Sequence, residues 1–408
     1  MSVNQPKFIM VFEIKFLIYL LSIVLITPYL SYSNNGHGKE RILIQSSDTS
    51  LKSDSLILDL SFIDLAEVPD SVFKMIHLEE LHLTKNQISL IPSEIGLLQN
   101  LRTLRLYSNK IEFLPEEIGY LNKLETLDLS WNPIKRLPKT IGNLKRLKIL
   151  AWNADSNIES FEGIQHLDSL ETLQVAYNLL EEIPKEVFEL DRLIVLDLSM
   201  NRIEDIPEEI TNLSMLEVLR LTNNRLTKFP KSICELPNLK EFSISARNQV
   251  YEIPREIKNL SSLLNLEVSS TGLKVIPSEI CDLSKLERLY LSSNEIESLP
   301  EEIGKLKNLK ELNLFNNKLN AFPSGIIELT KLEILDIGSN TIDNIPDNIS
   351  ELKNLRILGL RNLGLENLPL GIHELRGLQR LDLGGNNIPL DQVTVFKENN
   401  PQCRVIGL

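Results

Sequence analysis

The sequence predicts a repeat protein with one elongated domain, in which a short unit is stacked many times. Three observations predict it: a 23-residue pattern that recurs in phase, apolar residues that alternate as in a β-strand, and a regularly placed proline. The stretch Leu78–Asn100 (LEELHLTKNQISLIPSEIGLLQN) contains one complete copy. One copy cannot bury its own apolar side, so it must stack on others.

The unit contains a strand and a return segment. Counted from its first leucine, apolar residues occupy positions 1, 4, 6, 11, 14, 18 and 21, with asparagine at position 9 and proline at position 15. Because positions 4 and 6 alternate, Leu81 and Leu83 point inward, while positions 3, 5 and 7 point outward. Pro92 ends this register by fixing φ. Ile95 and Leu98 then bury one side of a short helical or extended return segment.

Copies of this unit fill most of the chain. They begin at Ser55, Leu78, Leu101, Leu124, Leu147, Leu170, Leu193, Leu216, Leu239, Leu263, Leu286, Leu309, Leu332, Leu355 and Leu378. This makes fourteen full units and a truncated fifteenth, all of 23 residues except one of 24. The asparagine at position 9 returns in most units, and a column of buried amides can satisfy backbone groups of neighbouring turns.

Two units depart from the pattern. The unit at Leu147 has Trp152 at inward position 6 and Phe161 in place of the proline. Asp155 stands where its asparagine belongs. The 24-residue unit has one added residue near Arg247, which we expect to bulge its turn.

The pattern L-x-x-L-x-L-x-x-N-x-L, held over roughly residues 55–408, resembles the leucine-rich repeat family. The resemblance implies an α/β fold, a right-handed, curved leucine-rich repeat solenoid with a parallel β-sheet on its concave face.

The first 33 residues differ in kind from the repeats. Basic residues precede an apolar run, Phe16–Ile26, of about the length of a signal-peptide core. We expect residues 1–33 to be a signal peptide cleaved after Ser33, with Met1 or Met10 as its start. The alternative is an uncleaved membrane anchor, for which the run is short.

Caps are expected at both ends of the repeats. Residues 34–54 read as a polar N-terminal tail, and the solenoid occupies residues 55–388, with an atypical first unit as its cap. Residues 389–408 abandon the repeat. Their segment DQVTVFKE predicts a closing helix, and CRVIGL predicts a last strand or lid.

The net charge and the cysteine content limit which partners and which cellular compartment are possible. The net charge of −13, without a basic stripe, argues against binding nucleic acid. Cys234 and Cys281 lie two units apart, roughly 10 Å, whereas a disulfide needs Cα atoms within about 7 Å. We therefore expect these two thiols and Cys403 to be free and mostly buried. The absence of disulfide-rich caps makes secreted bacterial members of the family the better resemblance.

No motif of an enzyme or a metal site is present. The five histidines are scattered among different repeat positions, and no phosphate-binding or zinc-binding motif occurs. Aspartates share outward position 5 in several units, but two or more units separate them, beyond direct carboxylate contact. We expect a non-enzymatic protein with no cofactor and no metal.

Large side chains stand out on the predicted concave face, where positions 3, 5, 7 and 8 are mostly small or polar. One group is Tyr107, Trp131, Tyr177 and Met200, and a second is Arg288, Tyr290 and Phe315. Exposed aromatic residues are enriched at binding hot spots, so both groups are candidate protein-binding residues. In the alternative interpretation, the aromatic residues at position 8 only shield the asparagine turn.

Together these observations predict an exported, monomeric protein that binds a protein partner through its concave face, with adhesion or host interaction as the expected role. Its compartment would be periplasmic, cell-surface or extracellular, without membrane insertion after signal removal. One alternative is a structural or scaffolding protein of the periplasm or envelope. Another is a regulatory scaffold of the small-GTPase type, if the N-terminal segment is not an export signal.

Overall fold

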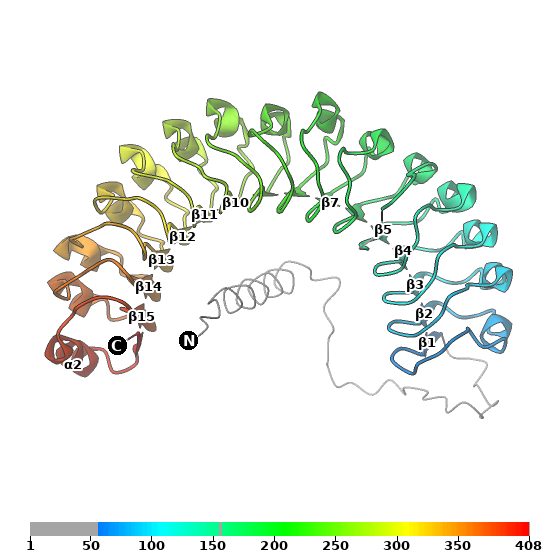
Figure 1. Ribbon diagram of the computed structural model, residues 1–408, viewed down its shortest axis with the longest axis horizontal. Coiled ribbons are helices and arrows are strands. Elements are labelled where there is room, and N and C mark those ends of the chain that lie inside the picture. The colour runs from blue at the N-terminus through cyan, green and yellow to red at the C-terminus, as the bar shows by residue number, and fades with distance from the viewer. Residues whose placement is uncertain (1–55, 155–156, 408) are drawn as a thin grey trace, which may run out of the picture. The chain divides into compact units, whose positions relative to one another are not determined.

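The computed structural model describes residues 56–154 and 157–407, all within one compact unit that spans Leu43–Leu408. The expected signal peptide, the polar tail and Asp155 lie outside the described residues. Within them, sixteen parallel strands form one sheet in chain order. The strands line the inner, concave side of a curved solenoid (Figure 1).

Each repeat contributes one strand of three residues. The strands are β1 (Ile57–Asp59), β2 (Glu80–His82), β3 (Thr103–Arg105), β4 (Thr126–Asp128), β5 (Ile149–Ala151), β6 (Thr172–Gln174), β7 (Val195–Asp197), β8 (Val218–Arg220), β9 (Glu241–Ser243), β10 (Asn265–Glu267), β11 (Arg288–Tyr290), β12 (Glu311–Asn313), β13 (Ile334–Asp336), β14 (Ile357–Gly359), β15 (Arg380–Asp382) and β16 (Arg404–Ile406). The middle residue, at position 4, points into the core in every repeat strand, and Leu81 and Leu104 are register partners with no exposed surface.

The return segments are 3-10 helices, which lie on the outer side of the curve (Figure 1). They are η1 (Val72–Lys74), η2 (Ser93–Leu97), η3 (Glu116–Tyr120), η4 (Lys139–Asn143), η5 (Ile164–His166), η6 (Lys185–Glu189), η7 (Glu208–Asn212), η8 (Lys231–Glu235), η9 (Arg255–Asn259), η10 (Ser278–Asp282), η11 (Glu301–Lys305), η12 (Ser324–Glu328), η13 (Asp347–Glu351) and η14 (Leu370–Glu374). In most of them the proline at position 15 directly precedes the helix, as Pro92 precedes η2. The prediction of a short return segment is confirmed.

The asparagines at position 9 form the predicted ladder. Asn109 donates from Nδ2 to the carbonyl oxygens of Leu106 and Leu83, both at 2.9 Å, and its Oδ1 accepts the Ile88 amide at 3.1 Å. The side chain therefore satisfies backbone groups of its own repeat and of the preceding one. The same three contacts recur at Asn132.

The two irregular repeats, at Leu147 and Leu239, preserve the packed core and the turn with other residues. Trp152 is fully buried, its ring lies 5.4 Å from that of Phe161, and its Nε1 donates to the Ile134 carbonyl at 3.1 Å. In the 24-residue repeat, Ala246 and Arg247 both have positive φ, which takes up the added residue. Asn248 still donates to backbone carbonyls of two repeats.

A helix and a last strand follow the final repeat. The helix α2 (Leu390–Asn399) follows the last repeat and places Phe396 in the core, and β16 then completes the sheet. Cys234, Cys281 and Cys403 are free and buried, which confirms that prediction. Among the described residues there is no helix with the length and apolar character needed to cross a bilayer.

Candidate functional site

The position at which each concave strand turns outward has an unusual backbone conformation. The residue at position 8 has a positive φ in nearly every described repeat, including 58° at Trp131, 62° at Tyr177 and 59° at Met200. Other repeats place a serine, an asparagine, a lysine, an alanine or a glycine there. A left-handed conformation is unfavourable for a residue with a bulky side chain. Large residues are therefore not expected at this position on structural grounds alone.

Backbone hydrogen bonds hold position 8 in place. The amide of Met200 donates to the Thr222 carbonyl at 2.8 Å, and the amide of Tyr177 donates to the Ser199 carbonyl at 3.1 Å. These bonds between repeats fix the backbone of the turn without using the side chain at position 8.

The structure brings Trp131 and Tyr177 together, and we call this pair the aromatic cluster. Their ring centroids lie 5.7 Å apart with the planes tilted by 47°, although a whole repeat separates them. That repeat has the buried Ala154 at position 8. Trp131 remains 43% exposed. The irregular repeat thus has a small residue where its neighbours have aromatic rings.

Met200 and Tyr107 flank the aromatic cluster. Met200 lies one repeat beyond Tyr177, and its sulfur contacts the side-chain amide of Asn223. Tyr107 is half-buried at position 7 of the β3 repeat. Burial and the nearby Asp197 carboxylate raise the pKa of Tyr177, so its hydroxyl stays protonated.

The second predicted group forms a polar network of its own. Arg288 donates from Nε to Glu311 at 3.1 Å and from Nη1 to Asn265 at 3.0 Å, and the Tyr290 hydroxyl donates to the other oxygen of Glu311. Burial and this carboxylate raise the pKa of Tyr290. Phe315 lies beneath the guanidinium of Arg361, which is 5.1 Å from the ring centroid. These side chains already have partners, so they are less available than the aromatic cluster.

Sequence reasoning missed two participants on this face. Glu311 is the register partner of Arg288, and the opposite charges at position 3 of adjacent repeats were the available signal. Phe62 occupies position 8 of the first repeat and is 57% exposed, with the Lys85 ammonium 5.3 Å from its ring. Counting large side chains at position 8 would have found it.

The aspartates at position 5 have a structural role. The carboxylate of Asp128 accepts the Ser130 amide at 3.0 Å, and that of Asp197 accepts the Ser199 amide at 3.0 Å. Such bonds, two residues ahead, are a usual way for aspartate to fix a turn. In the described part of the chain no group of three or more histidine, cysteine or acidic residues is arranged to hold a metal ion.

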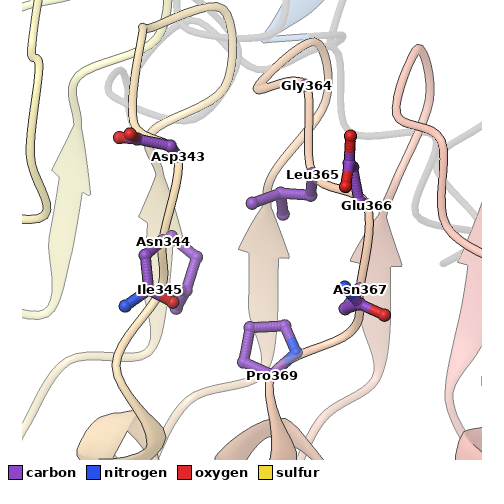
Figure 2. A pocket seen from close by; sticks show the side chains of 8 residues that line it. All are labelled: Asp343, Asn344, Ile345, Gly364, Leu365, Glu366, Asn367 and Pro369. Carbon is purple, nitrogen blue, oxygen red and sulfur yellow. The ribbon is translucent and has the colours of Figure 1, made fainter.

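A hollow of about 370 Å³ lies away from the concave strands. It is lined by Asp343, Asn344, Ile345, Gly364, Leu365, Glu366, Asn367 and Pro369. Figure 2 shows these residues on two neighbouring loops, which follow β13 and β14 in the chain. None of the predicted site residues lines this hollow.

The repeats match known protein families. The model of a leucine-rich repeat region matches residues 93–200 and 289–357, and the single leucine-rich repeat model matches residues 77–98, 192–213 and 215–236. No curated protein matches the chain.

Solved structures agree with this assignment. A leucine-rich repeat protein of Leptospira interrogans is 35% identical over 87% of this chain and 96% of its own, with a TM-score of 0.79. The plant peptide hormone receptor RGFR1, in complex with RGF2, is 28% identical over 77% of this chain and 52% of its own, with a TM-score of 0.60. An internalin (InlF) of Listeria monocytogenes is 23% identical over 82% and 88% of the two chains, with a TM-score of 0.62. The chain belongs to the leucine-rich repeat family.

Proposed function

We propose that this chain is an exported, non-enzymatic leucine-rich repeat protein that binds a protein partner through its concave face. The aromatic cluster and Met200 form the centre of the proposed binding surface. The single observation that carries the proposal is that these large apolar side chains occupy a left-handed backbone position at which most other repeats have small or polar residues.

Two further observations support binding rather than a purely structural role. Trp131 keeps much of its surface exposed although it packs on Tyr177, and such partly packed aromatic residues are typical hot spots. In addition, the similar plant receptor RGFR1 is seen in complex with RGF2. Adhesion or host interaction is the use we propose, since a bacterial leucine-rich repeat protein is similar over most of both chains.

The binding test is a pull-down from envelope and host-surface proteins, followed by affinity measurement with the captured partner. The double variant Trp131→Ala/Tyr177→Ala should lose at least about 2 kcal/mol of binding free energy, while its melting temperature barely changes. The matched control is Phe113→Ala/Tyr120→Ala, which removes two aromatic rings that are exposed away from the concave strands.

Two results would move the site elsewhere. If the Trp131/Tyr177 variant binds normally and an Arg288→Ala/Tyr290→Ala/Phe315→Ala variant does not, the second group is the binding surface. If neither variant is affected, the partner uses another surface.

Export is tested separately. The apolar run Phe16–Ile26 and the small residues that end at Ser33 predict a mature chain that begins at or near Asn34. Cell fractionation followed by mass spectrometry of the N-terminus measures this. An intact Met1 or Met10 terminus in a soluble cytosolic fraction would contradict export.

A further inference from the structure

Arg105, at position 5 of strand β3, is a cation on the concave face, and its Nε is buried with no hydrogen-bond partner among the residues that the structure describes. Within residues 56–154 and 157–407, no carboxylate forms a salt bridge with its guanidinium. Burial of a donor without an acceptor is destabilising, and buried polar groups in folded proteins are almost always satisfied. The residue as a whole is only half-buried, so its two Nη groups, rather than Nε, are the donors that a further acceptor can reach.

Other arginines of the same face do have partners. Arg220 occupies the same repeat position on β8, and its Nη2 lies 3.5 Å from Glu241 Oε2. Arg288 is bonded to Glu311 and Asn265. At Arg105 the adjacent acid is Asp128, its register partner, and no salt bridge between the two side chains is formed.

The register partners of Arg105 do not neutralise it by contact. One is His82, whose Nε2 is 3.3 Å from Glu80 and whose pKa is lowered by burial and by the Arg105 charge. The other is Asp128, which uses Oδ1 to accept the Ser130 amide; burial raises the pKa of this carboxyl, and the Arg105 charge acts in the opposite direction. The guanidinium keeps its capacity to donate to a further acceptor.

Arg105 also lies on the same face as the aromatic cluster. Trp131 belongs to the adjacent repeat and Tyr177 to the third repeat beyond β3, about 5 and 15 Å away along the solenoid at the usual spacing of parallel strands. A guanidinium binds a carboxylate by two parallel hydrogen bonds, and the rings offer an apolar surface. The combination suits a segment that presents an acid next to an apolar side chain.

We propose that Arg105 anchors an aspartate or glutamate side chain of an extended segment of the protein partner, while a neighbouring apolar side chain of that segment packs on Trp131 and Tyr177. The inference rests on the proposed function and specifies the chemistry of the partner. The concave sheet continues on both sides of β3, with β1 and β2 on one side and β4 onward on the other. The segment can therefore pass across Arg105, which favours an internal acidic residue over a chain terminus.

The test uses short peptides displayed on phage, fused at their C-termini so that no free terminal carboxylate is present, and selected on the full-length protein. Selected sequences should carry an aspartate or glutamate at a fixed spacing from an aromatic or aliphatic residue. The best peptide is then synthesised with blocked ends, together with its variant in which the acid is replaced by the matching amide.

A double-mutant cycle assigns the contact. Exchange of acid for amide in the peptide should weaken binding to the unmodified protein by at least about tenfold. The Arg105→Gln protein should bind both peptides equally weakly. The matched control, Arg220→Gln, removes an arginine from the same repeat position and should retain the tenfold preference for the acidic peptide.

Stability provides a readout that needs no ligand. Arg105→Gln should not lower the midpoint of urea unfolding, because it breaks no hydrogen bond, whereas Arg288→Gln should lower it. A loss at Arg105 as large as that at Arg288 would show a structural role and overturn the proposal.

The remaining outcomes separate the anchor from the function on which it rests. In one outcome, the Trp131/Tyr177 variant loses peptide binding, but neither Arg105→Gln nor the exchange of acid for amide in the peptide weakens it. The aromatic cluster is then the binding surface, and the proposed contact of Arg105 with an acid is wrong. A selection that yields no binding peptide, or only peptides without an acid, also overturns the anchor.

Discussion

At the scale of single residues, position 8 gives the most information about binding. It is the residue at which the chain turns out of each strand. The left-handed conformation there is strained for an L-residue, and asparagine tolerates it better than a long apolar side chain does. Asn223, Asn316 and Asn362 occupy this position in other repeats, with φ of 65°, 55° and 54°. Met200, with a φ of 59°, departs from this preference.

Replacement of Met200 by asparagine should therefore raise stability and lower partner binding. We expect a gain on the order of 0.5–1 kcal/mol in the free energy of unfolding, measured in urea, because the backbone conformation is better tolerated. The reverse change in the next repeat, Asn223→Met, is the control and should lower stability by a similar amount. A Met200→Asn protein that is less stable would mean that the methionine packs as a structural residue.

At the scale of the element, each repeat strand has three residues, and only the middle one enters the core. In β8, Leu219 is fully buried at position 4, and Thr222 follows at outward position 7. The side chain of Leu219 packs between neighbouring repeats, whereas Thr222 contributes its backbone carbonyl to the turn.

Truncation at these two positions should have very different effects. Leu219→Ala should cost about 2–5 kcal/mol through lost burial and the cavity left behind. Thr222→Ala should change stability by less than about 0.5 kcal/mol, since the backbone bond remains. Urea unfolding of both variants measures the difference, and equal losses would refute the assignment of inward and outward positions.

At the scale of the whole molecule, contacts between adjacent repeats carry the stability. Charges at position 2 alternate along the solenoid: Glu125 is 2.7 Å from Arg102 and 3.0 Å from Lys148. Such exposed pairs contribute only about 0.2–1 kcal/mol each. Each repeat also buries several leucines and isoleucines, at about 1.5–3 kcal/mol per side chain before chain entropy. Apolar stacking and the asparagine ladder therefore stabilise the solenoid more than the surface ion pairs do.

The reactivity of the three buried thiols measures how well the core is closed to solvent. Burial raises the pKa of Cys234 to about 12 and the pKa values of Cys281 and Cys403 to about 11. At pH 8 the folded protein should react with iodoacetamide at least about a hundredfold more slowly than the urea-unfolded chain, whose thiols have a pKa of about 8.5. Mass spectrometry of the labelled peptides measures each site. Labelling of Cys403 alone in the folded protein would show that the C-terminal cap opens independently.

The sequence by itself determined the repeat, the inward and outward positions, the asparagine ladder and the buried, unpaired cysteines. These features depend on local periodicity and on the chemistry of single side chains, which one unit already contains. Leu81, Asn109 and Cys234 lie where their repeat positions predict. The sequence also predicted that large side chains on the concave face are exceptional.

Only the tertiary structure decided which of those side chains meet and which still lack a partner. Trp131 reaches Tyr177 across the repeat of Ala154 because that residue is small, and Arg288 is occupied because Glu311 lies in register with it. Arg105 has the same repeat position as Arg220, but no acid in the described part of the chain forms a salt bridge with its guanidinium. These outcomes depend on side-chain packing between neighbouring repeats, which the repeat pattern leaves open because it constrains only the residues that face the core.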